Sequence, residues 1–221
     1  MTRDLQIGDL KCLCATTGRT DRVAYILYPM DMLEGWIESA TAHFGVTIVA
    51  ITGMDWQNVF SPWPAKGVPK GTPDFEGRSP EFLALLRDDV IPKVESELGL
   101  DKEVERTLVG VSMSGLFTLW QWALCDTFTN IASLSGSFWY EGFIDWFDHQ
   151  RFDSKTGRAY FLLGNLESRA RAFHAVGENT HIIVESLEHQ GVDVMFQSVP
   201  GDHYADPIPR LNASFTALFK K

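Results

Sequence analysis

The sequence predicts a single α/β domain, spanning residues 1–221, with a mostly parallel central sheet and helices on both of its faces. Strand-like and helix-like segments alternate along most of the chain, which is typical of parallel sheets because each parallel strand needs a crossover connection. The length of 221 residues suits one compact domain. With 45% hydrophobic and 22% charged residues, the composition is that of an ordinary globular protein.

Two kinds of apolar pattern define the elements. Short runs rich in β-branched and aromatic residues predict strands over 22–28, 46–52, 106–111, 130–134, 159–163 and 192–199. Helical periodicity predicts helices over 32–44, 80–98, 114–126, 180–190 and 208–220. Asp31 followed by Glu34 predicts a capping box before the first helix, and Ser79 followed by Pro80 predicts the N-cap of the second.

One long segment, residues 53–79, interrupts this alternation. Its repeated prolines and glycines exclude a continuous helix or strand, and loops of this length are usually functional. Because it contains Trp56 and Trp63, we predict a loop insertion that forms one wall of a ligand pocket. The aromatic segment 138–147 is the candidate opposite wall, and ordinary packing over the sheet edge is the alternative for both.

Charge and cysteine content exclude several functions. The net charge of −10 disfavours binding to nucleic acid or to an anionic membrane surface. Residues 1–10 do not resemble a signal peptide, and no apolar run reaches the ~18 residues of a membrane-spanning helix. Cys12, Cys14 and Cys125 lack metal-ligand spacing, and the first two alternate in a strand-like stretch as buried apolar residues do. We therefore expect a cytoplasmic protein without metal or cofactor.

A serine between a strand and a helix is the strongest chemical signal. The segment 107–115, TLVGVSMSG, runs from a short apolar strand through Gly110-x-Ser112-x-Ser114 into an apolar helix. A nucleophile elbow needs small residues on both sides of the serine, whose hydroxyl then projects above the sheet near a helix N-terminus. Ser114 stands where glycine is usual, and a purely structural turn is the alternative.

A rival serine pair follows the next predicted strand. Ser135 and Ser137 lack a glycine two residues before the first serine and have no clear buried helix behind them. We expect them to line the pocket rather than to act as the nucleophile.

Among six histidines, His203 is the best candidate base. It lies in the turn-rich segment 200–206, directly after the last predicted strand. His181, Glu185 and His189 share one helix face, a spacing that suits a metal but is more typical of a solvated surface.

The orienting acid should follow the strand between the serine and the histidine. Glu167 is the first carboxylate after the strand 159–163. Asn165 is an alternative through its amide oxygen, although a neutral group stabilises an imidazolium less well. A serine–histidine dyad without an acid is the other alternative.

The chain order Ser112, Glu167, His203 is that of α/β-hydrolases, and all three residues follow strand ends that would meet at one sheet edge. The N–H of Met113 is the first expected oxyanion donor. The second is the N–H of Met30, because Pro29 has no N–H.

The chain resembles the esterase branch of the α/β-hydrolase superfamily that includes enterochelin (ferric-siderophore) esterases and esterase D-like enzymes. The matching segments are 27–31, 62–64, 110–115, 131–139, 163–167 and 200–203. The resemblance implies an acyl-ester hydrolase of α/β-hydrolase fold, with Ser112 as nucleophile and His203 as base. It supports Glu167 less firmly, because the family commonly has an aspartate where Asn165 stands.

We therefore predict a carboxylesterase that acts on a small-molecule ester through a Ser112 acyl-enzyme. The alternatives are an acyltransferase that uses the same acyl-enzyme and a non-catalytic ligand-binding protein on the same fold. The predicted substrate-binding residues are Asp31, Trp56, Trp63, Ser137 and Trp139.

Overall fold

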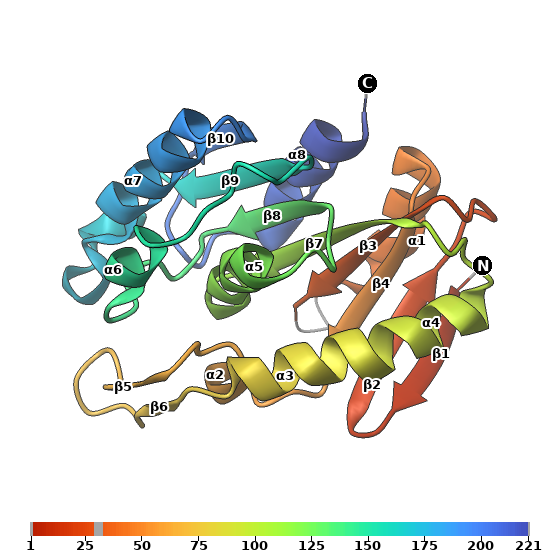
Figure 1. The fold of residues 1–221 in the computed structure, drawn as a ribbon, viewed down its shortest axis with the longest axis horizontal. Coiled ribbons are helices and arrows are strands. Elements are labelled where there is room, and N and C mark those ends of the chain that lie inside the picture. Colours follow the sequence, from red (N-terminus) through yellow and green to blue (C-terminus); the bar gives the residue numbers. More distant parts are fainter. Residues whose placement is uncertain (1, 29–32, 221) are drawn as a thin grey trace.

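The central sheet organises the fold. The computed structural model describes residues 2–28 and 33–220. Within them, eight strands form one sheet in the order β1-β2-β4-β3-β7-β8-β9-β10 (Figure 1). The strands are β1 (Thr2–Ile7), β2 (Leu10–Ala15), β3 (Arg22–Leu27), β4 (Thr47–Thr52), β7 (Glu105–Val111), β8 (Asn130–Leu134), β9 (Arg158–Gly164) and β10 (Asp193–Val199). From β4 to β10 all neighbours are parallel, whereas β2 pairs antiparallel with both β1 and β4.

Helices cover both faces of the sheet, which confirms the predicted fold class. One buried cluster holds side chains of α1 (Glu34–Phe44) and α8 (Pro207–Phe219). The other cluster holds side chains of α3 (Ser79–Leu85), a π-helical turn (Leu86–Val90), α4 (Ile91–Leu98), α5 (Met113–Leu124), α6 (Phe143–Phe147) and α7 (Val176–His189). In the described part of the chain no helix is both long and apolar enough to cross a membrane.

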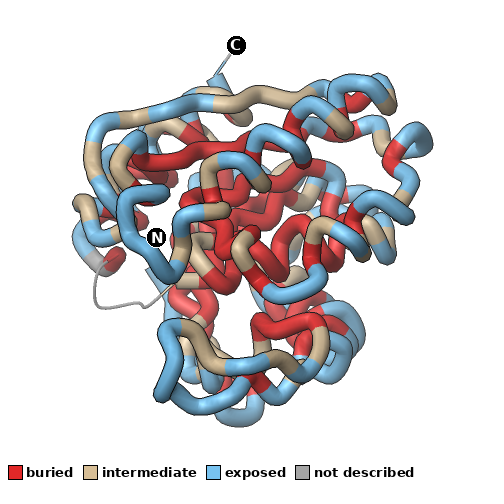
Figure 2. The backbone as a smooth tube through the Cα atoms, turned by 90° about the vertical axis from the view of Figure 1, so that its left-hand side faces the viewer, coloured by how far each residue is buried: buried red, intermediate tan, exposed pale blue. Residues whose placement is uncertain are grey.

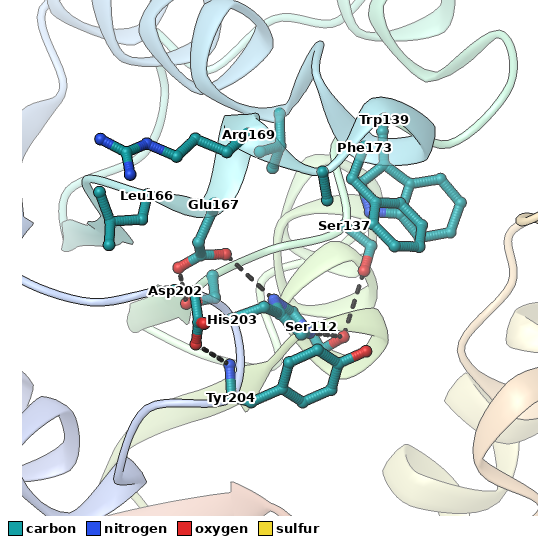
Figure 3. A pocket seen from close by; sticks show the side chains of 13 residues that line it. Ser112, Ser137, Trp139, Leu166, Glu167, Arg169, Phe173, Asp202, His203 and Tyr204 are labelled. Atoms are coloured by element: carbon teal, nitrogen blue, oxygen red, sulfur yellow. Dashed lines mark hydrogen bonds and ion pairs between the residues drawn. The ribbon is translucent and has the colours of Figure 1, made fainter.

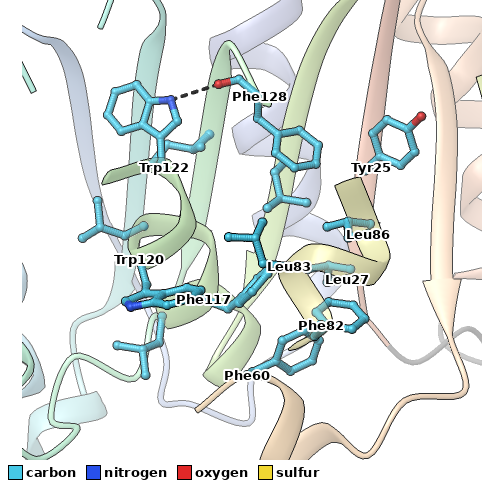
Figure 4. Close-up of a cluster of buried hydrophobic side chains, with 14 of the residues drawn as sticks. Tyr25, Leu27, Phe60, Phe82, Leu83, Leu86, Phe117, Trp120, Trp122 and Phe128 are labelled. Carbon is cyan, nitrogen blue, oxygen red and sulfur yellow. Dashed lines mark hydrogen bonds between the residues drawn. The ribbon is translucent and has the colours of Figure 1, made fainter. Parts of the chain in front are cut away.

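Many of the buried residues, red in Figure 2, lie toward the middle of the molecule, in the strands of the sheet and the helices that cover it. Aromatic rings fill much of this interior: Phe82 and Phe117 pack with ring centroids 5.3 Å apart, and both contact Phe60 (Figure 4). The indole of Trp122 is fully buried and donates a hydrogen bond to the Phe128 carbonyl at 3.1 Å. This packing holds α5 against the sheet. Ser112, the predicted nucleophile, lies at the N-terminus of that helix.

Cysteines Cys12 and Cys14 are buried in β2, in agreement with their alternation in the sequence. Burial raises the pKa of the Cys12 thiol to about 11 and that of Cys14 to about 12. Both side chains therefore stay protonated at neutral pH and act as small apolar packing residues.

The six predicted strands are present with their ends shifted by at most one residue, but one predicted helix cap is wrong. The helix α3 begins at Ser79 itself, with Arg78 at the N-cap position and no side-chain cap. The Ser79 hydroxyl instead donates to the carbonyl of Val59, which ties the helix to the preceding insertion. Pro80 lies in the first turn as predicted. The capping box predicted at Asp31 lies outside the described residues.

The insertion 53–79 folds into the short helix α2 (Trp56–Val59) and a small hairpin of β5 (Pro64–Ala65) and β6 (Phe75–Glu76). Aromatic contacts attach this hairpin to the segment 138–147. Trp63 packs against Phe143 with ring centroids 6.3 Å apart, and Phe75 packs against Tyr140 at 5.1 Å. The hairpin therefore lies against α6 and the chain that leads into it (Figure 1).

Candidate active site

A strained turn carries Ser112 at the carboxyl end of β7. Its backbone has φ 59° and ψ −120°, a left-handed conformation that is rare for a residue with a side chain. The helix α5 starts at the next residue, so Ser112 occupies its N-cap position. At Gly110 a Cβ atom would lie 2.2 Å from the Ser114 carbonyl oxygen. The close approach of strand and helix therefore requires glycine at 110.

Ser114, which replaces the usual glycine, has a structural role in the turn. Its hydroxyl lies 2.7 Å from the Leu27 carbonyl and accepts the N–H of Val111 at 2.7 Å. These bonds tie the start of α5 to the ends of β3 and β7. The serine at position 114, where glycine is usual, thus stabilises the turn. It leaves the Ser112 hydroxyl free to face the cavity that is described below.

Replacing Gly110 by alanine is expected to damage both the turn and the activity. Because the new Cβ would collide with backbone atoms that cannot move independently, we expect a loss of about 1–3 kcal/mol in the free energy of unfolding. Urea unfolding measures this change. The control is Gly35→Ala at an exposed position of α1, where nothing lies within 4 Å of the added Cβ and stability should stay the same or rise. Equal stability of both variants would contradict the close approach.

The three residues predicted as a relay meet above the sheet. The Ser112 Oγ lies 3.0 Å from His203 Nε2, and His203 Nδ1 lies 3.0 Å from Glu167 Oε2 (Figure 3). They follow β7, β10 and β9 respectively, all at the carboxyl edge of the sheet. With Nδ1–H donating to the carboxylate, Nε2 is left to accept the serine proton, which is the tautomer that a general base requires.

Glu167 is almost fully buried, at 4% exposure, and its second oxygen is saturated with donors. Oε1 accepts from the Ser135 hydroxyl at 2.7 Å, from the Gly164 N–H at 2.7 Å and from Arg210 Nη1 at 3.1 Å. Burial acts to raise the pKa of the Glu167 carboxyl, but hydrogen bonds from His203, Ser135 and Gly164 outweigh it and hold that pKa below its usual value. The side chain is therefore a carboxylate at neutral pH.

Asn165, the alternative orienting group, makes no side-chain hydrogen bond to His203 among the described residues and instead holds the histidine loop. Its Oδ1 accepts the N–H of Gly201 at 3.2 Å, and its own N–H donates to the Val199 carbonyl at 2.8 Å. Of the two candidates, Glu167 is the one that reaches the imidazole.

A cavity of about 690 Å³ opens over the Ser112 hydroxyl. Trp139 and Phe173 form an aromatic side of it, with ring centroids 4.9 Å apart. The Ser137 hydroxyl lies 3.3 Å from Ser112 Oγ. The full lining comprises Ser112, Ser135, Ser137, Trp139, Leu166, Glu167, Arg169, Ala170, Phe173, Val176, Asp202, His203 and Tyr204 (Figure 3).

Two predicted pocket residues do not line this cavity. Trp56 packs against Tyr28 and Phe60, and the Trp63 indole donates to the Glu141 carbonyl at 2.9 Å. The insertion is therefore not a wall of this cavity, in contrast to the prediction, because its aromatic rings pack against the protein interior and the segment 138–147. It contacts the cavity wall from behind, where the Phe75 ring lies 6.2 Å from the ring of Trp139.

Of the two predicted oxyanion donors, Met113 lies in the described part of the chain and Met30 does not. Met113 is the first residue of α5, where the backbone N–H groups have no intrahelical partner. Met30 and the predicted substrate-binding residue Asp31 lie outside the described residues.

Two features of the site were not predicted from the sequence: Arg210 and the segment 166–173, which supplies much of the cavity lining. Arg210 is 5% exposed although it carries a charge, and it lies on the buried side of α8 with Leu211 and Ser214. A charged residue on the apolar face of a predicted helix was the available signal. Residues 166–173 form two short 3-10 turns around Glu167–Arg169 and Arg171–Phe173, for which the sequence has no periodic pattern.

The two α7 histidines whose spacing would suit a metal, His181 and His189, contact other groups of the protein. The His181 ring packs on Phe196, with centroids 4.9 Å apart, and His189 Nδ1 lies 2.6 Å from the Glu185 carbonyl. Among the residues that the structure describes, no group of three or more His, Cys, Asp or Glu side chains is arranged to hold a metal ion.

The parallel sheet, the strained serine turn and the histidine that meets it from the last strand define the class of the protein: it has the α/β-hydrolase fold. A family model described as "Putative esterase" matches residues 29–205. The chain therefore belongs to this esterase family, and the resemblance seen in the motifs is confirmed.

Similar proteins of known structure share the whole fold. An IroE-like serine hydrolase from Shewanella oneidensis aligns with a TM-score of 0.82 and 16% identity, over 100% of this chain and 80% of that one. The siderophore hydrolase EstB from Aspergillus nidulans aligns with a TM-score of 0.77 and 17% identity, over 100% and 94%. A curated relative, the uncharacterized protein YbbA of Bacillus subtilis (strain 168), is 26% identical over 140 residues, 61% of this chain and 56% of that protein. The match thus spans little more than half of YbbA.

Proposed function

We propose that this protein hydrolyses small carboxylic esters through an acyl-enzyme on Ser112, with His203 as general base and Glu167 as the orienting acid. The observation that carries the proposal is the unbroken chain of hydrogen bonds from Ser112 through His203 to Glu167 at the base of the cavity. Membership of an esterase family supports the same reaction class.

The reaction follows from these contacts. His203 Nε2 accepts the proton of Ser112 as Oγ attacks the ester carbonyl, and the developing imidazolium is stabilised by Glu167 Oε2. The Met113 N–H at the start of α5 stabilises the oxyanion, with the Met30 N–H proposed as the second donor. His203 then protonates the leaving alcohol and activates the water that releases the acid.

The cavity favours an apolar or aromatic group of moderate size. Its volume of about 690 Å³ falls in the range of small-molecule sites, and Trp139 and Phe173 offer flat apolar surface. Similar structures include the siderophore hydrolases EstA and EstB from Aspergillus nidulans. Of the described lining residues only Arg169 carries a permanent positive charge, so we propose a smaller and less anionic ester for this chain.

The two departures from the usual motif do not favour a protein that binds esters without turnover. Ser114 closes hydrogen bonds within the turn, and Asn165 holds the backbone at Gly201. Neither occupies the path between Ser112 and His203, so both are compatible with catalysis.

Shortening Trp139 is expected to change substrate preference more than it changes the chemistry. The assay uses a series of p-nitrophenyl esters, from acetate to benzoate. Trp139→Ala should lower kcat/KM for the benzoate about 10-fold relative to the acetate, because a stacking interaction worth about 1.5 kcal/mol is lost. Trp56→Ala, which alters an aromatic residue outside the cavity, is the control and should leave the ratio unchanged. An unchanged ratio in Trp139→Ala would contradict the proposed binding surface.

Activity-based labelling tests the proposed nucleophile without knowledge of the substrate. A fluorophosphonate should label Ser112 of the wild type, identified by peptide mass spectrometry, and His203→Ala should abolish the label because the serine loses its base. Product analysis with added alcohols then separates hydrolysis from acyl transfer. A folded wild type that takes no label would contradict the proposal.

A further inference from the structure

A single buried arginine connects the segments that carry the acid and the base. Arg210, in the first turns of α8, donates through Nη1 to Glu167 Oε1 at 3.1 Å and to the Ser135 hydroxyl at 2.5 Å. Its Nη2 donates to the Asp202 carbonyl at 2.5 Å, one residue before His203. One rigid guanidinium thus contacts the segments that follow β8, β9 and β10.

The surrounding chain is shaped to admit this guanidinium. At Gly164 a Cβ atom would lie 2.8 Å from Arg210 Nη2 and 2.9 Å from Glu167 Oε1. Ser135 adopts φ 52°, which is unusual for a residue with a side chain, and its hydroxyl lies between Arg210 and Glu167. Such strain persists only where the surroundings stabilise it. The network is therefore a specific arrangement rather than a chance surface contact.

The two oxygens of Glu167 are consequently not equivalent. Oε1 is occupied by Arg210, Ser135 and the Gly164 N–H, so only Oε2 is turned to His203. The planar fork of an arginine holds a carboxylate and a carbonyl from two separate nitrogens in fixed geometry, whereas the three donors of lysine share one nitrogen.

We propose that Arg210 is a positioning residue for ester hydrolysis: it locks Glu167 in the orientation that serves His203 and fixes the histidine loop through Asp202. This inference rests on the proposed function.

In the described part of the chain, the charges around the relay come from three segments. The turn after β9 supplies Glu167 and Arg169, the histidine loop supplies Asp202, and α8 supplies Arg210. The residue from the segment after β8, Ser135, is neutral. Of the two cations, only Arg210 has a bond to Glu167, so its removal is the change that exposes the full carboxylate charge to His203.

The test compares kcat and KM for p-nitrophenyl acetate in wild type, Arg210→Met and Arg210→Lys. Arg210→Met should lower kcat about 10- to 100-fold with KM within about twofold, because Glu167 and the histidine loop lose their anchor while the cavity is unchanged. Arg210→Lys keeps the charge and should recover part of this loss, while kcat stays below the wild type because a single nitrogen cannot take the places of both Nη1 and Nη2. The control is Arg158→Met, which alters an exposed arginine paired with Asp193 and should match the wild type.

A loss in Arg210→Met that falls on KM as much as on kcat, with no recovery in Arg210→Lys, would mean a merely structural role and would overturn the proposal, as would wild-type kinetics. If Arg210→Met does not fold, Glu167→Gln/Arg210→Met removes both buried charges together. Added to Glu167→Gln, the second change should then lower kcat by less than about 10-fold, because Glu167 no longer needs positioning and only the bond to the Asp202 carbonyl is lost. A larger further loss would overturn the proposal. Absence of Ser112-dependent turnover in the wild type would instead contradict the proposed function.

Discussion

Replacing Ser112 by alanine is expected to lower kcat for p-nitrophenyl acetate by about 10⁴- to 10⁶-fold. The hydroxyl is the group that lies 3.0 Å from His203 Nε2, and the acyl-enzyme requires it. The residual rate should come from the oxyanion donors and from substrate binding, which the variant retains. Steady-state kinetics on purified protein measures the loss, and thermal unfolding checks that the variant is folded.

The neighbouring serine offers the matched control for this experiment. Ser137 Oγ lies 3.3 Å from Ser112 Oγ and lines the same cavity, but it has no bond to His203 among the described contacts. Ser137→Ala should therefore cost less than about 10-fold, in the range of a lost hydrogen bond. If Ser137→Ala abolished turnover while Ser112→Ala retained it, the nucleophile would have been misassigned.

The predicted parts of the fold are those with strong local signals. Strands β3, β4, β7 and β8 are buried on both faces, so their sequences are nearly continuous apolar runs that stand out from the chain. The edge strand β1 is largely exposed and polar, and it was not predicted for that reason. Ser112, Glu167 and His203 could be predicted to lie close together because each comes within four residues of the end of a strand of the parallel sheet.

The parts that could not be predicted depend on contacts between distant segments. Arg210 lies 43 residues from Glu167 and 75 from Ser135 in the sequence, and nothing local to α8 indicates that they meet. Likewise, the insertion has the composition of a pocket wall, but the packing of Trp63 on Phe143 turns its aromatic rings away from the cavity. Composition identified the aromatic residues and tertiary packing decided where they point.

Replacing Glu167 by glutamine is expected to affect activity and stability together. Loss of the carboxylate should lower kcat about 10³- to 10⁴-fold, because His203 loses the group that sets its tautomer and stabilises its charged form. The change also leaves Arg210 buried without its counter-charge, which should lower the free energy of unfolding by about 3–5 kcal/mol. Urea unfolding measures the second effect. The control Glu185→Gln, on the exposed face of α7, should change neither quantity appreciably.

Acid should narrow the difference in stability between wild type and Glu167→Gln. Although burial opposes ionisation, the hydrogen bonds from His203, Ser135 and Gly164 hold the pKa of Glu167 below its usual value. A carboxyl with a lowered pKa stabilises the fold fully above its unfolded pKa of about 4.3, and this contribution is lost as pH falls through the folded pKa. Between neutral pH and about pH 3, the wild type should therefore lose more stability than the glutamine variant, which has no carboxyl to protonate. A constant difference across that range would mean that Glu167 is not held as a carboxylate, and the assignment of its role in orienting His203 would fail with it.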